Sequence, residues 1–105
     1  MSNDNDSGIN FLFIGWVKEI KNGVDSDKVW TAFETNGTYY AGWGARGKKI
    51  SFKKHTSKYS LEDVMRKKKK DYAEVDAFQL FTIFPYFTED VSKYLMLDLL
   101  MNKVK

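Results

Sequence analysis

The side chains best suited to bind a ligand stand in a glycine-rich corner, where Trp43 lies between Gly42 and Gly44 and Arg46 follows. Because glycines carry no side chain, the indole of Trp43 has free flanks and could stack on a sugar or on an exposed base. A guanidinium is well suited to hold a phosphate. We expect the corner to present Trp43 and Arg46 together, with a packed corner indole as the alternative for Trp43.

Positive charge gathers directly after this corner. Residues 46–70 carry eleven Lys and Arg against two carboxylates, a net charge of +9, whereas the rest of the chain has a net charge of −6. A basic surface attracts polyanions, of which nucleic acid is the natural example, although a lysine run can also be a solvated helix face. The predicted nucleic-acid-binding residues are Trp43, Arg46, Lys48, Lys49, Lys53, Lys54, Arg66, Lys67, Lys68, Lys69 and Lys70.

Evidence for catalysis is thin. The single histidine, His55, lies among lysines with no carboxylate beside it, and the absence of cysteine excludes thiolate chemistry. Gly42, Gly44 and Gly47 fit the spacing of a dinucleotide-binding fingerprint, but they lead into a predicted strand instead of a helix. The sequence therefore predicts no enzyme, no cofactor and no metal site, and it places His55 at the surface or near a bound phosphate.

The scaffold of the corner has the pattern of an antiparallel sheet. Asn36 and Gly37 separate two runs rich in β-branched and aromatic residues, which indicates a hairpin with a type I′ turn. A nearly continuous apolar run near the N-terminus indicates a first strand that is covered on both faces. The predicted strands are residues 11–17, 29–33, 38–43 and 50–54, with a polar connection over residues 22–27. Trp30 lies at the start of the second of these strands, and its assignment to the core follows from the family resemblance given below.

The second half of the chain is predicted to hold two helices and one more strand. Ser60 has the position of a helix N-cap, with acidic residues in the first turn and lysines in the last. Residues 74–84 have the apolar content of a strand, which Pro85 ends. Thr88 begins a final helix that runs to about Lys103. The aromatic residues expected in the core of this part are Phe78, Phe81, Phe84, Tyr86 and Phe87.

Apolar residues surround most of the predicted final helix. A domain of this size cannot easily cover such a helix on every side, so a second copy or a protein partner could contact Leu97, Leu100 and Met101. The alternative is that the helix lies in the concavity of the sheet, beneath the Phe-rich strand.

Together these patterns predict an α+β fold, a twisted antiparallel sheet of about five strands with one helix after the fourth strand and a C-terminal helix. At 105 residues the chain has the length of a single domain, predicted over residues 9–105 after a disordered tail at residues 1–8. The polar, acidic N-terminus does not resemble a secretory signal, and no apolar run reaches the length of a membrane span. We therefore expect a cytoplasmic protein without membrane contact, in the host cytoplasm if the protein is viral.

A tryptophan early in one strand, an Asn-Gly turn, the corner at residues 43–47 and a lysine run before Tyr72 follow one another between about residues 28 and 75. In this order the sequence resembles the WGR domain, with Ala45 at the position of the family's arginine and Arg46 one position later. WGR domains occur in DNA-dependent poly(ADP-ribose) polymerases and in small bacterial and viral proteins. Their Trp and Arg contact DNA at a break or 5′ end.

The resemblance implies that this protein binds nucleic acid without catalysis, DNA in preference to RNA, with Trp43 stacking at a strand end or break and Arg46 as the substitute for the motif arginine. Residues 76–105 lie beyond the resemblance and are interpreted as an integral strand and helix extension of the same domain.

A protein-interaction module is the competing hypothesis. A small inhibitor or adaptor of viral or mobile-element type could use the basic face to meet an acidic protein and the final helix to dock or dimerise. Substitution of Trp43 and Arg46, compared with substitution of Leu97, Leu100 and Met101, distinguishes the two hypotheses.

Overall fold

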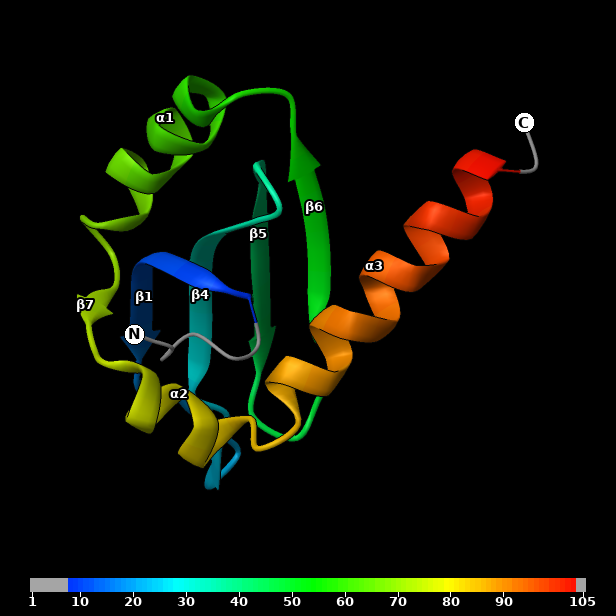
Figure 1. The fold of residues 1–105 in the computed structure, drawn as a ribbon. Helices are drawn as coiled ribbons and strands as arrows, with labels where there is room; N and C mark the ends of the chain where they lie inside the picture. Colours follow the sequence, from blue (N-terminus) through cyan, green and yellow to red (C-terminus); the bar gives the residue numbers. More distant parts are fainter. Residues whose placement is uncertain (1–7, 104–105) are drawn as a thin grey trace.

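A computed structural model describes residues 8–103, with only the backbone for residues 102 and 103. Its main sheet has five strands in the order β6-β5-β4-β1-β7, and every neighbouring pair is antiparallel (Figure 1). The strands are β1 (Asn10–Val17), β4 (Lys28–Thr35), β5 (Thr38–Ala45), β6 (Ser51–His55) and the short β7 (Ala73–Glu74). The helices are α1 (Lys58–Lys68), α2 (Ala77–Ile83) and α3 (Phe87–Lys103). The predicted α+β class and the antiparallel sheet are confirmed. The predicted disordered tail lies, except for Gly8, outside the described residues.

Two Asn-Gly pairs make tight turns. Asn36 and Gly37 have φ angles of 53° and 79°, the positive values that a type I′ hairpin turn requires, and they join β4 to β5 as predicted. Asn22 and Gly23, with φ angles of 53° and 76°, join β2 (Ile20–Lys21) to β3 (Val24–Asp25) in the same way. The connection predicted as plain polar loop thus contains a two-stranded ribbon.

Helices cover the sheet on both faces, which we call the α1 face and the α2/α3 face. Successive residues of β4 point to opposite faces, so Trp30 and Ala32 pack toward Leu61 of α1, whereas Val29 and Phe33 pack toward the other helices. Leu80 of α2 and Phe87 of α3 close the α2/α3 face. β1 supplies buried residues to both faces, which confirms that this strand is covered on each side.

The prediction of a strand at residues 74–84 is wrong, because most of this segment is helix α2. The side chain of Asp76 accepts a hydrogen bond of 3.0 Å from the backbone N–H of Gln79 and so caps the helix. The buried residues of the segment and of the helix that follows recur at helical spacing, four, three and four residues apart. They are Leu80, Phe84, Phe87 and Val91. Only β7, two residues long, pairs with the sheet.

This change of structure also redistributes the aromatic cluster that was expected in the core. Phe84 and Phe87 are buried, but Phe78, Phe81 and Tyr86 are exposed. A helix directs only one stripe of side chains toward the sheet, so Phe78 and Tyr86 face outward. Phe81 lies at the edge of the stripe, where its ring contacts those of Phe11 and Phe87.

The starts of the other two helices also differ from prediction. Helix α1 begins three residues earlier than expected, with Ser57 as the N-cap, and its first turn holds no acidic residue. Its last turn holds basic residues, as predicted. Helix α3 begins at Phe87, so Thr88 lies inside the helix, and it ends at Lys103 as predicted.

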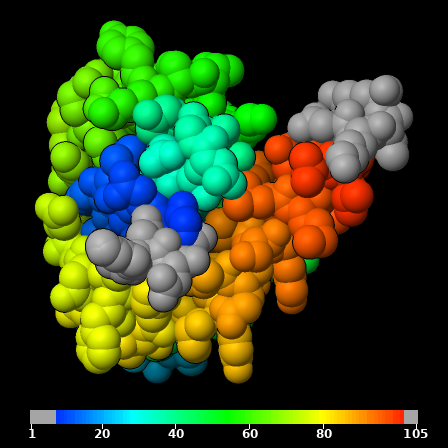
Figure 2. Space-filling view, viewed as in Figure 1, coloured from blue at the N-terminus to red at the C-terminus, as the bar shows by residue number. Residues whose placement is uncertain are grey.

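The two halves of α3 have different surroundings. Val91 is buried, and Tyr94 and Leu95 pack against the core, whereas Met96, Leu97, Leu99, Leu100 and Met101 are exposed. The second half of the helix stands out from the rest of the molecule (Figures 1 and 2). Among the described residues, no helix combines the length and the apolarity needed to cross a membrane.

Candidate nucleic-acid interface

A groove of about 340 Å³ lies on the α1 face, between strands β5 and β6 and helix α1. Strands β4 and β5 form its floor, helix α1 forms one wall and Tyr72, just after the helix, closes one end. The residues that line it are Trp30, Ala41, Trp43, Lys53, His55, Val64, Lys68 and Tyr72. We call this recess the Trp43 groove.

Trp43 is the most accessible aromatic ring of the groove. It pairs in register with Trp30 on the neighbouring strand, but Trp30 is 3% exposed and Trp43 is 36% exposed. Trp30 is thus the core residue that the sequence predicted. Within the described part of the chain, the indole of Trp43 has no hydrogen bond and no ring contact, so its exposed part is available to a ligand.

The glycines beside Trp43 serve packing on the opposite face of the sheet. A Cβ atom at Gly42 would lie 2.9 Å from the ring of Phe52, and one at Gly44 would lie 3.2 Å from the carbonyl oxygen of Lys49. The sequence pointed to Trp43 through these glycines. Their structural role is to let β6 approach β5 closely on the α2/α3 face.

Two of the predicted lysines reach the Trp43 groove from different elements. Lys53 belongs to β6 and Lys68 to the last turn of α1. The Nζ atom of Lys68 lies 5.9 Å from the ring centroid of Tyr72, within the range of a cation–π contact. Nearby, Nζ of Lys69 lies 5.6 Å from the ring centroid of Phe13. The groove therefore combines aromatic surface with positive charge.

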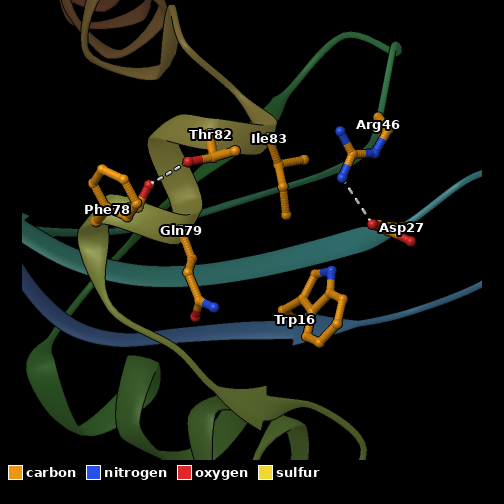
Figure 3. A pocket seen from close by; sticks show the side chains of 7 residues that line it. All are labelled: Trp16, Asp27, Arg46, Phe78, Gln79, Thr82 and Ile83. Carbon is orange, nitrogen blue, oxygen red and sulfur yellow. Dashed lines mark hydrogen bonds and ion pairs between the residues drawn. The ribbon is translucent and has the colours of Figure 1, made fainter.

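Arg46 lies on the other side of the sheet. Its guanidinium Nη2 is 2.9 Å from Oδ2 of Asp27, and its backbone N–H donates a 2.7 Å hydrogen bond to the carbonyl of the same residue (Figure 3). Arg46 and Asp27 line a second pocket of about 320 Å³ with Trp16 and helix α2, away from Trp43. The corner therefore does not present the indole and the guanidinium together.

The pair of Asp27 and Arg46 has an internal electrostatic role. Asp27 is only 3% exposed, and a lone buried carboxylate would be costly. The hydrogen bond from Arg46 lowers the pKa of Asp27, against burial, which raises it. Arg46 thus compensates a buried charge, a role that could not be predicted from the sequence because 19 residues separate the two partners.

The other predicted cations do not converge on the Trp43 groove. Lys54 points to the α2/α3 face, where its Nζ lies 3.8 Å from Oδ2 of Asp98, because successive residues of a strand alternate between faces. Arg66 and Lys67 both pair with Asp63, at 2.6 Å and 3.9 Å. Lys48, Lys49 and Lys70 are exposed. Only Trp43, Lys53 and Lys68 of the predicted set line the groove.

His55 is buried, not at the surface as predicted. It is 6% exposed, and its Nδ1 lies 3.0 Å from Oγ of Ser60 in α1. Burial and, to a smaller extent, the charge of Lys53 lower the pKa of His55, so its ring is neutral at physiological pH. His55 therefore joins β6 to α1 and brings no positive charge into the groove.

Tyr72 is the groove residue that sequence reasoning missed. The backbone of Gly15 makes room for it, since a Cβ atom at Gly15 would lie 2.6 Å from Cβ of Tyr72. Burial raises the pKa of Tyr72, so the phenol stays protonated near neutral pH. The available signal was a single glycine within the apolar run of β1, which indicates a close approach of another segment.

Within residues 8–101, no group of three or more His, Asp and Glu side chains is placed to hold a metal ion. Comparison of the chain with protein-family models, with curated proteins and with solved structures gives no match. The resemblance to the WGR domain therefore stays a prediction from the motif residues, and the functional argument rests on the geometry of the Trp43 groove.

Proposed function

We propose that this protein binds nucleic acid without catalysing a reaction, and that it binds DNA in preference to RNA. Phosphates contact lysines on the α1 face, and Trp43 stacks at a strand end or break. The observation that supports this most is the Trp43 groove, where the partly exposed indole of Trp43, which has no hydrogen bond or ring contact among the described residues, shares the lining with Lys53 and Lys68.

The lysines supply affinity that does not depend on sequence. Lys53 and Lys68 line the groove, and Lys69 follows in the turn after α1. Neutralising phosphates releases counterions, so the affinity should fall steeply as salt increases. The net charge of +9 over residues 46–70 favours this association over long range as well.

Stacking on Trp43 supplies the second contribution. A base that stacks on an aromatic side chain contributes about 1–3 kcal/mol, and the contribution tolerates any base because every base has a planar face. Arg46, engaged with Asp27, is not needed for this contact. The proposed site is therefore smaller than the set of cations that the sequence suggested.

Fluorescence anisotropy with labelled nicked duplex, intact duplex and single-stranded DNA at two salt concentrations tests the proposal. We expect the double variant Lys53→Ala, Lys68→Ala to lose affinity and to reduce the salt slope by about two. The matched control is Arg66→Ala, Lys67→Ala, which removes the same charge from residues paired with Asp63. Equal losses in the two variants would contradict the groove as the site, and no binding at low salt would contradict the function.

The exposed end of α3 supports a second candidate function, a protein-interaction module that docks or dimerises through this helix. Leu97, Leu100 and Met101 are 61%, 53% and 63% exposed, and a cluster of exposed apolar side chains is a common mark of a protein interface. Sedimentation of the wild type and of Leu97→Ser, Leu100→Ser tests this candidate. A concentration-dependent dimer that the substitutions abolish supports it, and a monomer at every concentration contradicts dimerisation.

A further inference from the structure

We infer that the Trp43 groove takes one unpaired base, so that the preferred ligand of this protein is single-stranded nucleic acid rather than intact duplex. This inference rests on the proposed function and specifies the structure of its ligand. The groove combines aromatic, apolar and positively charged side chains from β4, β5, β6, α1 and the turn after α1.

The shape of the recess favours an unpaired base. A base inside a duplex has both faces covered by its stacked neighbours, and only its edges are accessible in the duplex grooves. In the interior of a duplex, an aromatic side chain can stack on a base only after that base has left the stack, whereas an unpaired base has a free face. The accessible ring of Trp43 lines a recess bounded by the sheet and by α1, which a single base can enter. Its volume of about 340 Å³ falls within the usual range of small-molecule sites.

The chemistry of the lining suits the planar ring of a base. Tyr72 provides a second aromatic ring, and both Tyr72 and Trp43 also line an adjoining hollow of about 230 Å³. The floor and the helix wall between them carry the apolar side chains of Ala41 and Val64. A planar, weakly polar group is therefore the ligand portion that this part of the groove suits, and an isolated phosphate is not.

The positions of the lysine charges suit the phosphate of the same nucleotide. Lys53 and Lys68 lie at the same recess, and Nζ of Lys68 is 5.9 Å from the ring centroid of Tyr72. A phosphate attached to a stacked nucleotide can thus meet an ammonium group without moving away from the ring. His55 adds no competing positive charge within the groove, since its Nδ1 is engaged with Ser60 and burial favours the neutral ring. Base and phosphate of one nucleotide are accommodated together.

The deciding experiment separates bases from phosphates. Anisotropy titrations at one fixed low salt concentration use three labelled probes, a 15-residue oligothymidylate, an abasic oligonucleotide with the same number of phosphates, and a blunt duplex. We expect the oligothymidylate to bind about 5- to 150-fold more tightly than the abasic strand, the factor that corresponds to one stacked base. It should also bind more tightly than the duplex.

Variants locate the effect in the groove. Trp43→Leu and Tyr72→Leu should lower the affinity for oligothymidylate toward that for the abasic strand and leave abasic binding unchanged. Tyr72→Phe keeps the ring and should retain the preference. The matched control is Tyr59→Leu, since Tyr59 is an exposed tyrosine of α1 outside the groove.

The outcomes distinguish failure of this inference from failure of the proposed function. Equal affinity for the oligothymidylate and the abasic strand overturns the inference and the stacking contribution of Trp43, and it leaves phosphate binding as the remaining part of the proposed function. Tighter binding of the duplex overturns the inference alone. Failure of every probe to bind at low salt overturns both. The comparison of intact and abasic strands uses the wild-type protein, so the test stands even if a variant at Tyr72 fails to fold.

Discussion

The two faces of the sheet share the same strands but differ in how completely helices cover them. On the α2/α3 face, the ring of Phe33 contacts four other aromatic rings at centroid distances of 5.6–6.2 Å, and Phe87 closes the layer. On the α1 face, the core cluster holds five buried apolar residues, and a groove with an exposed tryptophan lies beside it. The α2/α3 face therefore holds the larger aromatic core, and the α1 face has a smaller core with the Trp43 groove beside it.

The helices explain the difference. Helices α2 and α3 together present a continuous row of buried side chains to the sheet, including Leu80 and Val91. Helix α1 has only Leu61 fully buried, with Val64 and Met65 partly buried, so it packs along a narrow apolar stripe. A helix that packs along a narrow stripe leaves the C-terminal end of β5 uncovered, and Trp43 lies at that end.

The largest loss of stability is expected in the aromatic core of the α2/α3 face. Phe87→Ala should lower the free energy of unfolding by about 3–5 kcal/mol, because the substitution removes a fully buried ring and leaves a cavity. Urea unfolding followed by tryptophan fluorescence measures it. Trp43→Ala should cost clearly less, since the indole is partly exposed, and equal losses from the two substitutions would contradict the division of the faces.

The next largest loss of stability is expected on substitution of Arg46. Arg46→Ala should destabilise the fold by about 1–3 kcal/mol, because Asp27 would keep a buried carboxylate without its hydrogen-bond partner. Arg66→Ala is the matched control, since its pair with Asp63 is exposed and worth less than about 1 kcal/mol. A variant with unchanged stability that loses DNA affinity as strongly as the Lys53→Ala, Lys68→Ala protein would instead assign Arg46 the phosphate contact implied by the WGR resemblance.

The pH dependence of stability separates the faces in another way. The pKa of His55 is lower in the folded protein than its ordinary value of 6.5, so the unfolded chain binds the proton first. Stability should therefore be constant above pH 7.5 or so and fall as the pH drops through 6.5, by at most about 1.4 kcal/mol per pH unit for one proton. Unfolding curves between pH 7.5 and 5.5 test this.

Two controls assign the pH effect to the α1 face. His55→Gln should flatten the profile between pH 7.5 and 5.5. The lowered pKa of Asp27 acts in a different range, because its contribution is complete above the ordinary value of 3.8 and is lost as the pH falls below it. A steep loss near pH 6 that persists in the His55 variant would show that another group is responsible.

The smallest effect is expected at the protruding end of α3. Leu97→Ser, Leu100→Ser should change the free energy of unfolding by no more than about 0.5 kcal/mol per site in a monomer, because both side chains are exposed. Thermal unfolding at two protein concentrations measures it. A large, concentration-dependent loss would mean that this surface is covered in solution, which favours the dimer of the competing hypothesis.

Local signals predicted much of the fold correctly. The hairpin of β4 and β5 followed from Asn36 and Gly37, whose turn geometry depends on those two residues alone. The same signal was present at Asn22 and Gly23, where the flanking strands are too short to show a pattern. The segment at residues 74–84 was misjudged because its dense apolar residues fit either period, and the cap at Asp76 was the better guide.

The candidate site was only partly predictable for the same reason. Trp43 was found because its glycine neighbours are adjacent in the sequence. Tyr72 and His55 reach the groove only through the docking of α1 and the turn after it, which no short window of sequence describes. Grouping the lysines by their order in the chain joined Lys53 and Lys54, although a strand directs them to opposite faces.

By itself, the sequence determined the α+β class, the type I′ turn and the concentration of positive charge, because each of these depends on local conformation or on composition. Only the tertiary structure decided where the charge is used. It joined Arg46 to Asp27 across 19 residues, set Lys54 against Asp98, and left Lys53 and Lys68 beside Trp43. The physical reason is that the partner of a side chain depends on which face each element presents and on which segments pack against it.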